Sequence, residues 1–116
     1  MAENLIAHCE IPTTDLEKSK DFYFKVLGWD FKPFGKGYLL FNNHKGTMVG
    51  LRQVDEVAKG ESTVFHVNMP DIDSILKHVK DNGGAVARTK TVIPAMGWYA
   101  LFNDPDGNTM GLYQKS

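Results

Sequence analysis

Three side chains capable of acid–base chemistry fall on two short segments in which apolar and polar residues alternate. His8 and Glu10 are two positions apart in the segment 5–11, and His66 lies in the segment 63–69. Alternation with a period of two is typical of a half-buried β-strand, so His8 and Glu10 share one face of theirs. Imidazole and carboxylate groups are common general acids and bases, and His, His and Glu can together hold a divalent metal.

The elements that position these residues belong to a chain that repeats itself. The segment 99–114 aligns without a gap on the segment 38–53, 61 positions earlier. Over the 17 pairs from Gly37/Trp98 to Gln53/Gln114, eight are identical, where average residue usage gives roughly one. Each copy predicts two strands joined by a turn that contains Gly. An internal duplication determines the architecture, so the chain is expected to contain two similar units.

Each unit also predicts one helix after its first strand. In the first unit, Pro12 is expected to end the strand, and Thr14 and Glu17 form a capping box with Thr14 as N-cap. Apolar residues at helical spacing then predict a helix over about 15–27, with Gly28 just past its end. In the second unit, Asp71 is expected to cap a helix that stops at 82–84.

The remaining segments complete the pattern of each unit. Residues 29–33, 38–42 and 47–53 predict strands in the first half, and residues 85–93 with the copied hairpin predict them in the second. The charged segment 54–61 has no periodicity and is expected to link the halves. We therefore predict an α+β fold, a single domain over 1–116 made of two βαβββ modules at about 1–56 and 57–116, whose curved sheets form a cleft.

The alternation in the strands predicts which side chains face the cleft. Apolar positions such as Ile11, Val49, Leu51, Met110 and Leu112 are expected to face the helices, since a helix must cover an apolar face. The other face then carries the candidate cleft lining, with glycines leaving room for a ligand: His8, Glu10, Met48, Gly50, Arg52, His66, Asn68, Gly111 and Tyr113, with Trp98 as a possible wall. An alternative is a solvated face with an internal ion pair between Glu10 and Arg52.

Composition excludes several classes of function. The net charge is −1, and Lys and Arg are scattered, so nothing in the sequence indicates a nucleic-acid or membrane partner. No apolar run has the length of a transmembrane helix, and the first residues do not resemble a signal peptide. Cys9, the only cysteine, cannot form an internal disulfide, so we expect a cytoplasmic protein.

Four motifs together resemble a known family. They are His8-Cys-Glu-Ile-Pro12, Asp15-Leu-Glu-Lys-Ser-Lys-Asp-Phe-Tyr23, Leu27-Gly-Trp29 and Asp104-Pro-Asp-Gly-Asn108. In this order they resemble the glyoxalase/bleomycin resistance/dioxygenase superfamily, also called vicinal oxygen chelate, over nearly the whole chain. The resemblance implies two βαβββ modules that form a cleft, and it implies small-molecule ligands and a homodimer.

The same resemblance implies where a divalent metal would be held. Metal-using members take one ligand from the first and one from the last strand of each module, and these places are here His8, Gly50, Val64 and Gly111. Only His8 offers a donor, whereas a catalytic metal generally needs about three protein ligands. No cofactor is therefore expected, and the chain is most similar to glyoxalase-like members without an assigned reaction.

Three functions stay open from the sequence. The first is a protein that binds a small molecule without the standard metal, with Arg52 suited to an anionic or carbonyl-bearing ligand and with His8, Glu10 or His66 as acid–base groups if a reaction occurs. The second is a metal-dependent lyase or isomerase whose metal is held at a shifted site by His8, Glu10 and His66. The third is a drug-sequestering protein of the bleomycin-resistance kind. His44 and His78 are expected to be solvated.

Overall fold

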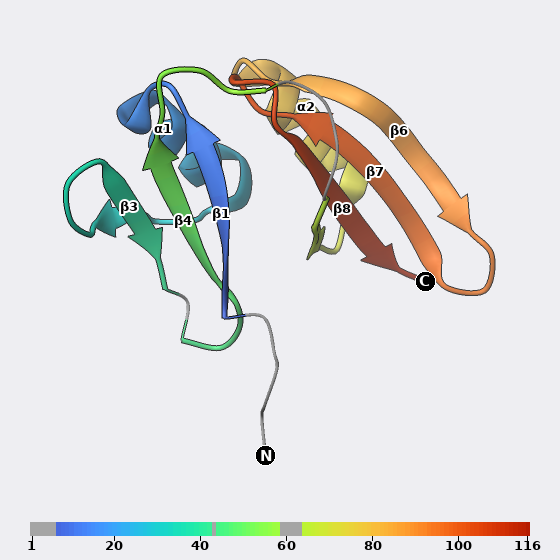
Figure 1. Ribbon diagram of the computed structural model, residues 1–116. Coiled ribbons are helices and arrows are strands. Elements are labelled where there is room, and N and C mark those ends of the chain that lie inside the picture. Colours follow the sequence, from blue (N-terminus) through green and yellow to red (C-terminus); the bar gives the residue numbers. More distant parts are fainter. Residues whose placement is uncertain (1–6, 43, 59–63) are drawn as a thin grey trace.

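Two modules of the same topology make up the chain. The structure is a computed structural model and describes residues 7–42, 44–58 and 64–116. The first module contains β1 (His8–Thr13), α1 (Leu16–Leu27), β2 (Lys32–Pro33), β3 (Tyr38–Phe41) and β4 (Met48–Gln53). The second contains β5 (His66–Asn68), α2 (Ile72–Asp81), β6 (Ala85–Ile93), β7 (Gly97–Asn103) and β8 (Thr109–Lys115). Figure 1 shows the first module, in blue to green, beside the second, in yellow to red.

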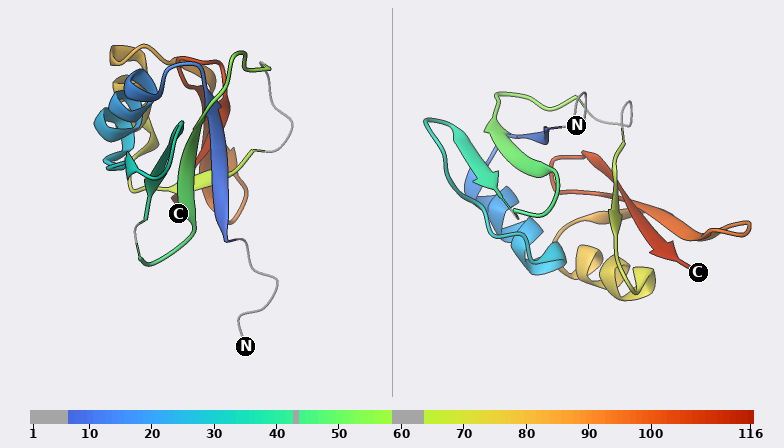
Figure 2. Two further views of the ribbon diagram at one scale, coloured as in Figure 1. Left: turned by 60° about the vertical axis from the view of Figure 1, so that its left-hand side comes forward. Right: turned by 90° about the horizontal axis from the view of Figure 1, so that it is seen from below.

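The sheets confirm the duplication. Each has four strands, in the order β1-β4-β3-β2 in one and β5-β8-β7-β6 in the other, and in each the first strand of the module runs parallel to the last. The α+β class and the paired βαβββ modules are therefore as predicted. Both helices lie on the same side of the two sheets, which Figure 2 shows from two directions, and they contact each other.

One apolar core joins the two modules. Val49 and Leu51 of β4 and Met110 and Leu112 of β8 are buried in it, as the alternation predicted. Phe22 of α1 packs against Phe102 of β7, with 6.1 Å between their ring centroids. α1 therefore packs against residues of both modules. Neither helix of the described residues is long and apolar enough to cross a membrane.

Two predictions about the first strand and helix are wrong. β1 continues through Pro12 to Thr13, because it is the edge strand of its sheet and can lose one backbone N–H. The N-cap of α1 is Asp15, whose carboxylate accepts from the Lys18 backbone N–H at 3.1 Å, and not Thr14. Thr14 instead donates its hydroxyl to Asp106 of the second module. A partner distant in sequence has therefore moved the start of the helix by one residue.

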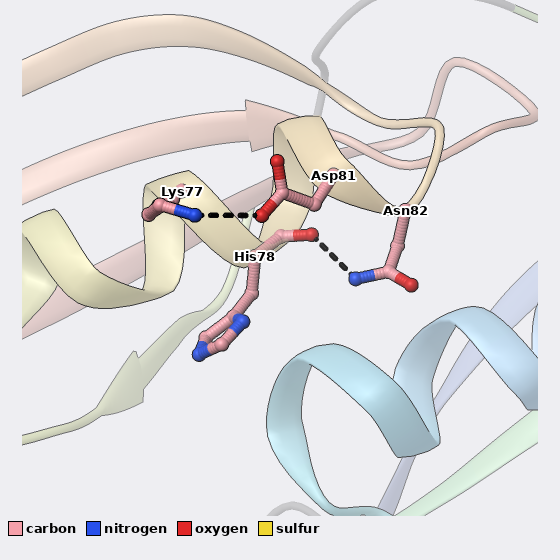
Figure 3. A network of polar contacts seen from close by, with 4 residues as sticks. All are labelled: Lys77, His78, Asp81 and Asn82. Atoms are coloured by element: carbon pink, nitrogen blue, oxygen red, sulfur yellow. Dashed lines mark hydrogen bonds and ion pairs between the residues drawn. The ribbon is translucent and has the colours of Figure 1, made fainter.

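The ends of the helices otherwise follow the local signals. Gly28 adopts a left-handed conformation after α1, with φ at 74°, and Asp71 caps the start of α2. At the end of α2, the Asn82 side chain donates to the His78 carbonyl at 2.8 Å, beside the ion pair of Lys77 and Asp81 (Figure 3). The His78 imidazole is exposed and takes no part in these contacts. His44 is also exposed, and its hydrogen bond to Asn42 is made by the backbone N–H.

Several strands are shorter than the sequence predicted. β2 covers only 32–33 of the expected 29–33, and β5 covers 66–68 of the expected 63–69. Residues 5–6 of the first predicted strand, residue 63 of the fifth and residues 59–61 of the predicted linker lie outside the described residues.

Candidate functional site

A pocket lies on the face of the first sheet that is turned away from the helices. His8 and Glu10 of β1 pair with Met48 and Gly50 of β4, so alternate residues of both strands project to this face. The pocket has a volume of about 480 Å³, within the range of small-molecule sites. Its lining comes entirely from the first module and is mostly apolar: His8, Glu10, Phe34, Tyr38, Leu40 and Met48.

An ion pair stands beside this pocket. The Nε of Arg52 donates to Glu10 Oε1 at 2.6 Å, and the side chains of Arg52 and Glu10 remain 51% and 37% exposed. This is the pairing that the sequence left open as an alternative. Burial, followed by a hydrogen bond to Glu10 and the negative charge of Glu10, raises the pKa of Tyr38, while the charge of Arg52 acts against the rise. Glu10 therefore organises both a cation and a phenol at the rim of the pocket.

The two candidate glycines do not leave space for a ligand. A Cβ placed on Gly50 would collide with the hydroxyl of Tyr38, and one on Gly111 would collide with the imidazole of His66. Each glycine is buried under that side chain. The expectation that these positions are open is wrong because a neighbouring strand of the same chain fills them: β3 in the first module and β5 in the second.

The standard metal site of the resemblance does not fit these residues. Gly50 and Gly111 stand where carboxylate ligands are expected, and the volume that such side chains would need is occupied by Tyr38 and His66. Val64, the fourth place, has no donor atom. Within the described parts of the chain, no group of three His, Cys, Asp or Glu side chains lies close enough to hold a metal ion. The described residues of one chain therefore do not bring His8, Glu10 and His66 together as the shifted metal site.

The other candidates of the second module lie apart from the pocket. His66 lies on β5 with its ring 6.4 Å from that of Tyr99, and Asn68 is exposed on the same edge strand. Tyr113 of β8 donates its hydroxyl to the Met96 carbonyl at 2.7 Å. Trp98 packs against the core and carries the Lys90 ammonium over its ring at 4.6 Å, so it is a core residue and not a wall of the pocket.

Three residues that line the pocket were missed by the sequence reasoning. Tyr38 and Leu40 alternate with buried Leu39, and this period of two could have placed them on the open face. Phe34 follows β2 and is 64% exposed, and no local signal in the sequence marks it.

A second polar cluster holds the two modules together. Asp106 accepts hydrogen bonds from the Thr13 hydroxyl at 2.6 Å and from the Thr14 hydroxyl at 2.7 Å. Asn108 Nδ2 donates to the Pro12 carbonyl at 2.8 Å. The turn between β7 and β8 is thus bound to the junction between β1 and α1, and we call the turn 104–108 the inter-module latch.

Asp104 is the buried centre of the latch. It is 3% exposed and accepts from the Tyr23 hydroxyl at 2.8 Å and from the backbone N–H groups of Asp106 and Asn108. Burial raises the pKa of Asp104, although hydrogen bonds from Asn108 and Tyr23 act against the rise. Burial, the charge of Asp104 and its hydrogen bond raise the pKa of Tyr23 well above its usual value. The sequence indicated only a turn here.

Comparison with known proteins decides the family. The model of the Glyoxalase/Bleomycin resistance protein/Dioxygenase superfamily matches residues 5–112. The chain belongs to this superfamily. A "Glyoxylase-like domain-containing protein" of Didymella fabae is 27% identical over an alignment of 114 residues that covers 90% of this chain and 88% of that protein.

Solved structures of the superfamily share the fold. TnmS3, an antibiotic binding protein from Streptomyces sp. CB03234, is 27% identical with a TM-score of 0.72, and the match covers 100% of this chain and 99% of that one. The fosfomycin resistance protein FosX from Listeria monocytogenes is 15% identical with a TM-score of 0.80, over 100% of this chain and 96% of that one. A mutant of FosX has been solved with Mn(II). The superfamily thus includes metal-binding members, whereas three of the four metal positions of this chain, Gly50, Val64 and Gly111, have no side-chain donor.

Proposed function

We propose that this protein binds a small carbonyl-bearing molecule in the pocket on the open face of the first module, without the divalent metal of its relatives. The observation that carries the proposal is the pocket itself, which is large enough for a small ligand and has an apolar floor with polar groups at one side. Sites of this composition bind apolar molecules and use a few polar groups to orient them.

The ion pair beside the pocket determines the class of ligand. From the sequence, Arg52 was expected to suit an anionic or carbonyl-bearing ligand. In the structure its Nε donates a hydrogen bond to Glu10, and the ion pair has no net charge. An anionic ligand would have to compete with the Glu10 carboxylate, whereas a neutral carbonyl can accept a hydrogen bond from His8. We therefore favour the uncharged carbonyl compound over the anion.

His8 is the acid–base group that this pocket offers a ligand. An imidazole is the side chain suited to proton exchange near neutral pH, while Glu10 is engaged by Arg52. His66, the third candidate, belongs to the other module and is not part of the pocket lining. Any reaction in the pocket is thus expected to depend on His8 and to proceed independently of His66.

Sequestration is the second candidate function. It is favoured by the likeness to TnmS3, an antibiotic binding protein that matches this chain over nearly its full length. A sequestering protein returns its ligand unchanged, and a lyase or isomerase does not. Incubation of a bound ligand with the protein, followed by mass spectrometry, separates the two functions.

A homodimer is part of the proposal. It rests on the resemblance to the superfamily, which implies a homodimer, and four large apolar side chains of the described residues are more than half exposed and so available to an interface: Phe24, Phe34, Val92 and Met96. Light scattering should give twice the 13.0 kDa mass of the chain. A monomeric mass at micromolar concentration would contradict this part alone.

The central experiment compares three probes of the same size and different charge. Acetophenone, benzoate and benzylammonium are titrated by calorimetry against the wild type and against Met48→Trp, which fills the pocket. We expect acetophenone to bind best and the variant to weaken it at least about tenfold, as occlusion of an apolar site does. Thr89→Trp adds the same side chain at an exposed position of β6 and should bind like the wild type.

Two results would contradict the proposal. Preferred binding of benzoate or benzylammonium would exclude the ligand class. Equal affinity of Met48→Trp and wild type would exclude the pocket. Elemental analysis of protein purified without chelator should find no stoichiometric divalent metal, and a metal that is lost in His8→Ala would exclude the metal-free site.

A further inference from the structure

A second cavity lies between the two modules, on the other side of the first sheet. Cys9 of β1 pairs with Val49 of β4, and both point to the helix side, away from the pocket of His8. The cavity measures about 320 Å³ and is bounded on its other side by β5. β5 is the edge strand of the second module's sheet, and Figure 1 shows it, in yellow-green, on the side of β8 that is turned toward the first module. The chain therefore has two separate spaces, and this one is built by both modules.

The apolar wall of the cavity is aromatic and already ordered. Trp29 and Phe41 stack with 5.6 Å between centroids and 16° between ring planes, and Trp29 stacks in turn on buried Tyr23. Phe65 lines the side that belongs to the second module. Rings that are held in place before binding lose little conformational freedom when an aromatic ligand packs on them.

Polar groups without partners complete the lining. The side chains of Thr47, His66 and Asn68 form no hydrogen bond with any residue that the structure describes. They present both donors and acceptors to the cavity. A polar group that enters the cavity can thus be satisfied without breaking an existing bond.

The described residues of the lining include no Asp, Glu, Lys or Arg. An ionised ligand would lose solvation without gaining a counter-charge, and this penalty is large. The lining therefore selects uncharged molecules.

We propose that the inter-module cavity is a second binding site, for an uncharged aromatic molecule with one hydrogen-bonding group. The ring packs against Trp29, Phe41 and Phe65, and the polar group is held by His66 and Asn68. This site does not depend on the proposed function of the first pocket, since the two linings share no residue.

Cys9 makes the site directly testable. It is the only cysteine of the chain, it is partly accessible, and it lines the cavity. The rate at which a small thiol reagent modifies Cys9 therefore reports on whether the cavity is filled. Three probes of similar shape are compared: 2-naphthol, naphthalene and 2-naphthoate. Calorimetry measures their affinities independently of the thiol reaction.

We expect 2-naphthol to slow modification of Cys9 at least about tenfold at saturation, naphthalene to bind more weakly and 2-naphthoate to have no effect. Asn68 is exposed, and Asn68→Leu keeps the size of its side chain but removes the polar group. This variant should bind 2-naphthol more weakly and bind naphthalene with unchanged affinity. Thr47→Trp should block both ligands, while Thr89→Trp on β6 should bind like the wild type.

Each outcome decides the proposal. No calorimetric binding of 2-naphthol, or binding that leaves Cys9 fully reactive, would overturn it. Equal protection by 2-naphthoate would overturn the ligand class, and a loss of binding in Thr89→Trp as large as in Thr47→Trp would overturn the location. Because Met48→Trp fills the first pocket only, retained 2-naphthol binding in that variant distinguishes failure of the first site from failure of this one.

Discussion

The two modules share a backbone plan and use it differently at one equivalent point. Gly50 and Gly111 are aligned by the repeat, and each lies beside a residue of the first strand of its module: Glu10 in one and His66 in the other. In the first module the space above the glycine is filled by Tyr38, which comes from β3. In the second it is filled by His66, which comes from β5 itself.

This difference accounts for the pocket on the open face of the first module. Tyr38 reaches across to Gly50 and leaves Glu10 to pair with Arg52, so the end of the sheet near His8 stays open. In the second module the position of Arg52 is Tyr113, which is engaged by Met96. A duplicated framework can thus keep its strands and change its site by exchanging the side chain that covers a glycine.

The turns of the two hairpins also differ in the contacts that they make. The turn between β7 and β8 is the inter-module latch, whereas in the corresponding turn of the first module Asn42 accepts one bond, from the His44 backbone N–H at 3.0 Å. We expect Asp104→Ala to lower the free energy of unfolding by about 2–4 kcal/mol, since several buried donors lose their acceptor.

The comparison change in the first module is Asn42→Ala, one residue before the position that the repeat aligns with Asp104, and it should cost less than about 0.5 kcal/mol because Asn42 is exposed. Urea unfolding of both variants measures the comparison. Equal losses of stability in the two variants would mean that the inter-module latch stabilises only its own turn and not the contact between the modules.

The glycine pairs offer the next largest effect. Gly50→Ala and Gly111→Ala should each destabilise the protein by about 1–3 kcal/mol, because the new methyl group displaces a packed side chain. The penalty of Gly50→Ala should largely vanish in a Tyr38→Ala background, and that of Gly111→Ala in a His66→Ala background.

Crossed combinations are the control for this cycle. Gly50→Ala with His66→Ala should be additive, because the two residues lie in different modules. Coupling in the crossed pair, or additivity in the matched pairs, would contradict the assignment of Tyr38 and His66 to their glycines.

Acidification should weaken the latch more than any contact of the first hairpin. Burial alone would raise the pKa of Asp106, but hydrogen bonds from Thr13 and Thr14 and the charge of Lys18 lower it overall. The stability that Asp106 contributes is fully present at a pH above its ordinary pKa of 3.8. It is lost as the pH falls through the lower pKa that Asp106 has in the folded protein.

The loss is expected to be below about 1 kcal/mol because Asp106 is partly solvated. The raised pKa of Asp104 acts with the opposite sign, since its ionised form is the less favourable one when folded. The free energy of unfolding at pH 7, 4 and 3, compared between the wild type and Asp106→Asn, measures the contribution of Asp106. An acid dependence that persists unchanged in Asp106→Asn would assign it elsewhere.

The repeated glutamines should show the smallest difference. Gln114 accepts from the Ile72 backbone N–H at the start of α2, and Gln53 donates to the Thr14 carbonyl just before α1. Gln114→Ala should cost about 0.5–1 kcal/mol because its bond is partly buried, and Gln53→Ala only a few tenths. Thermal unfolding of the two variants compares their losses of stability. A larger loss in Gln53→Ala than in Gln114→Ala would contradict the prediction.

Local chemistry made most of the fold predictable. Gly28 and Asp71 mark helix ends through bonds within a few residues, and the alternation through Val49 and Leu51 reflects burial of one strand face. The repeat supplied the topology, because two similar sequences build units of the same topology. The same local reasoning failed at Thr14, whose partner Asp106 is 92 residues away.

The candidate site was less predictable because it depends on how sheets and modules meet. The sequence placed His8 and His66 on equivalent strands and could not show that each belongs to a different space. Nor could it show that Tyr38 fills the position above Gly50, since a glycine in a strand indicates free volume as readily as filled volume. The pairing of Glu10 with Arg52 remained one of two alternatives until the structure placed the two side chains together.

The latch also has a consequence for synthesis of the chain. Thr13 and its acceptor Asp106 are separated by 93 residues, so their contact is among the most non-local in the molecule. Contacts of this kind close late and slow the folding of small domains. While the protein is being translated, the junction between the first strand and the first helix cannot make these bonds until the turn 104–108 has left the ribosome. Completion of the first module alone is therefore not enough to give this junction its native contacts.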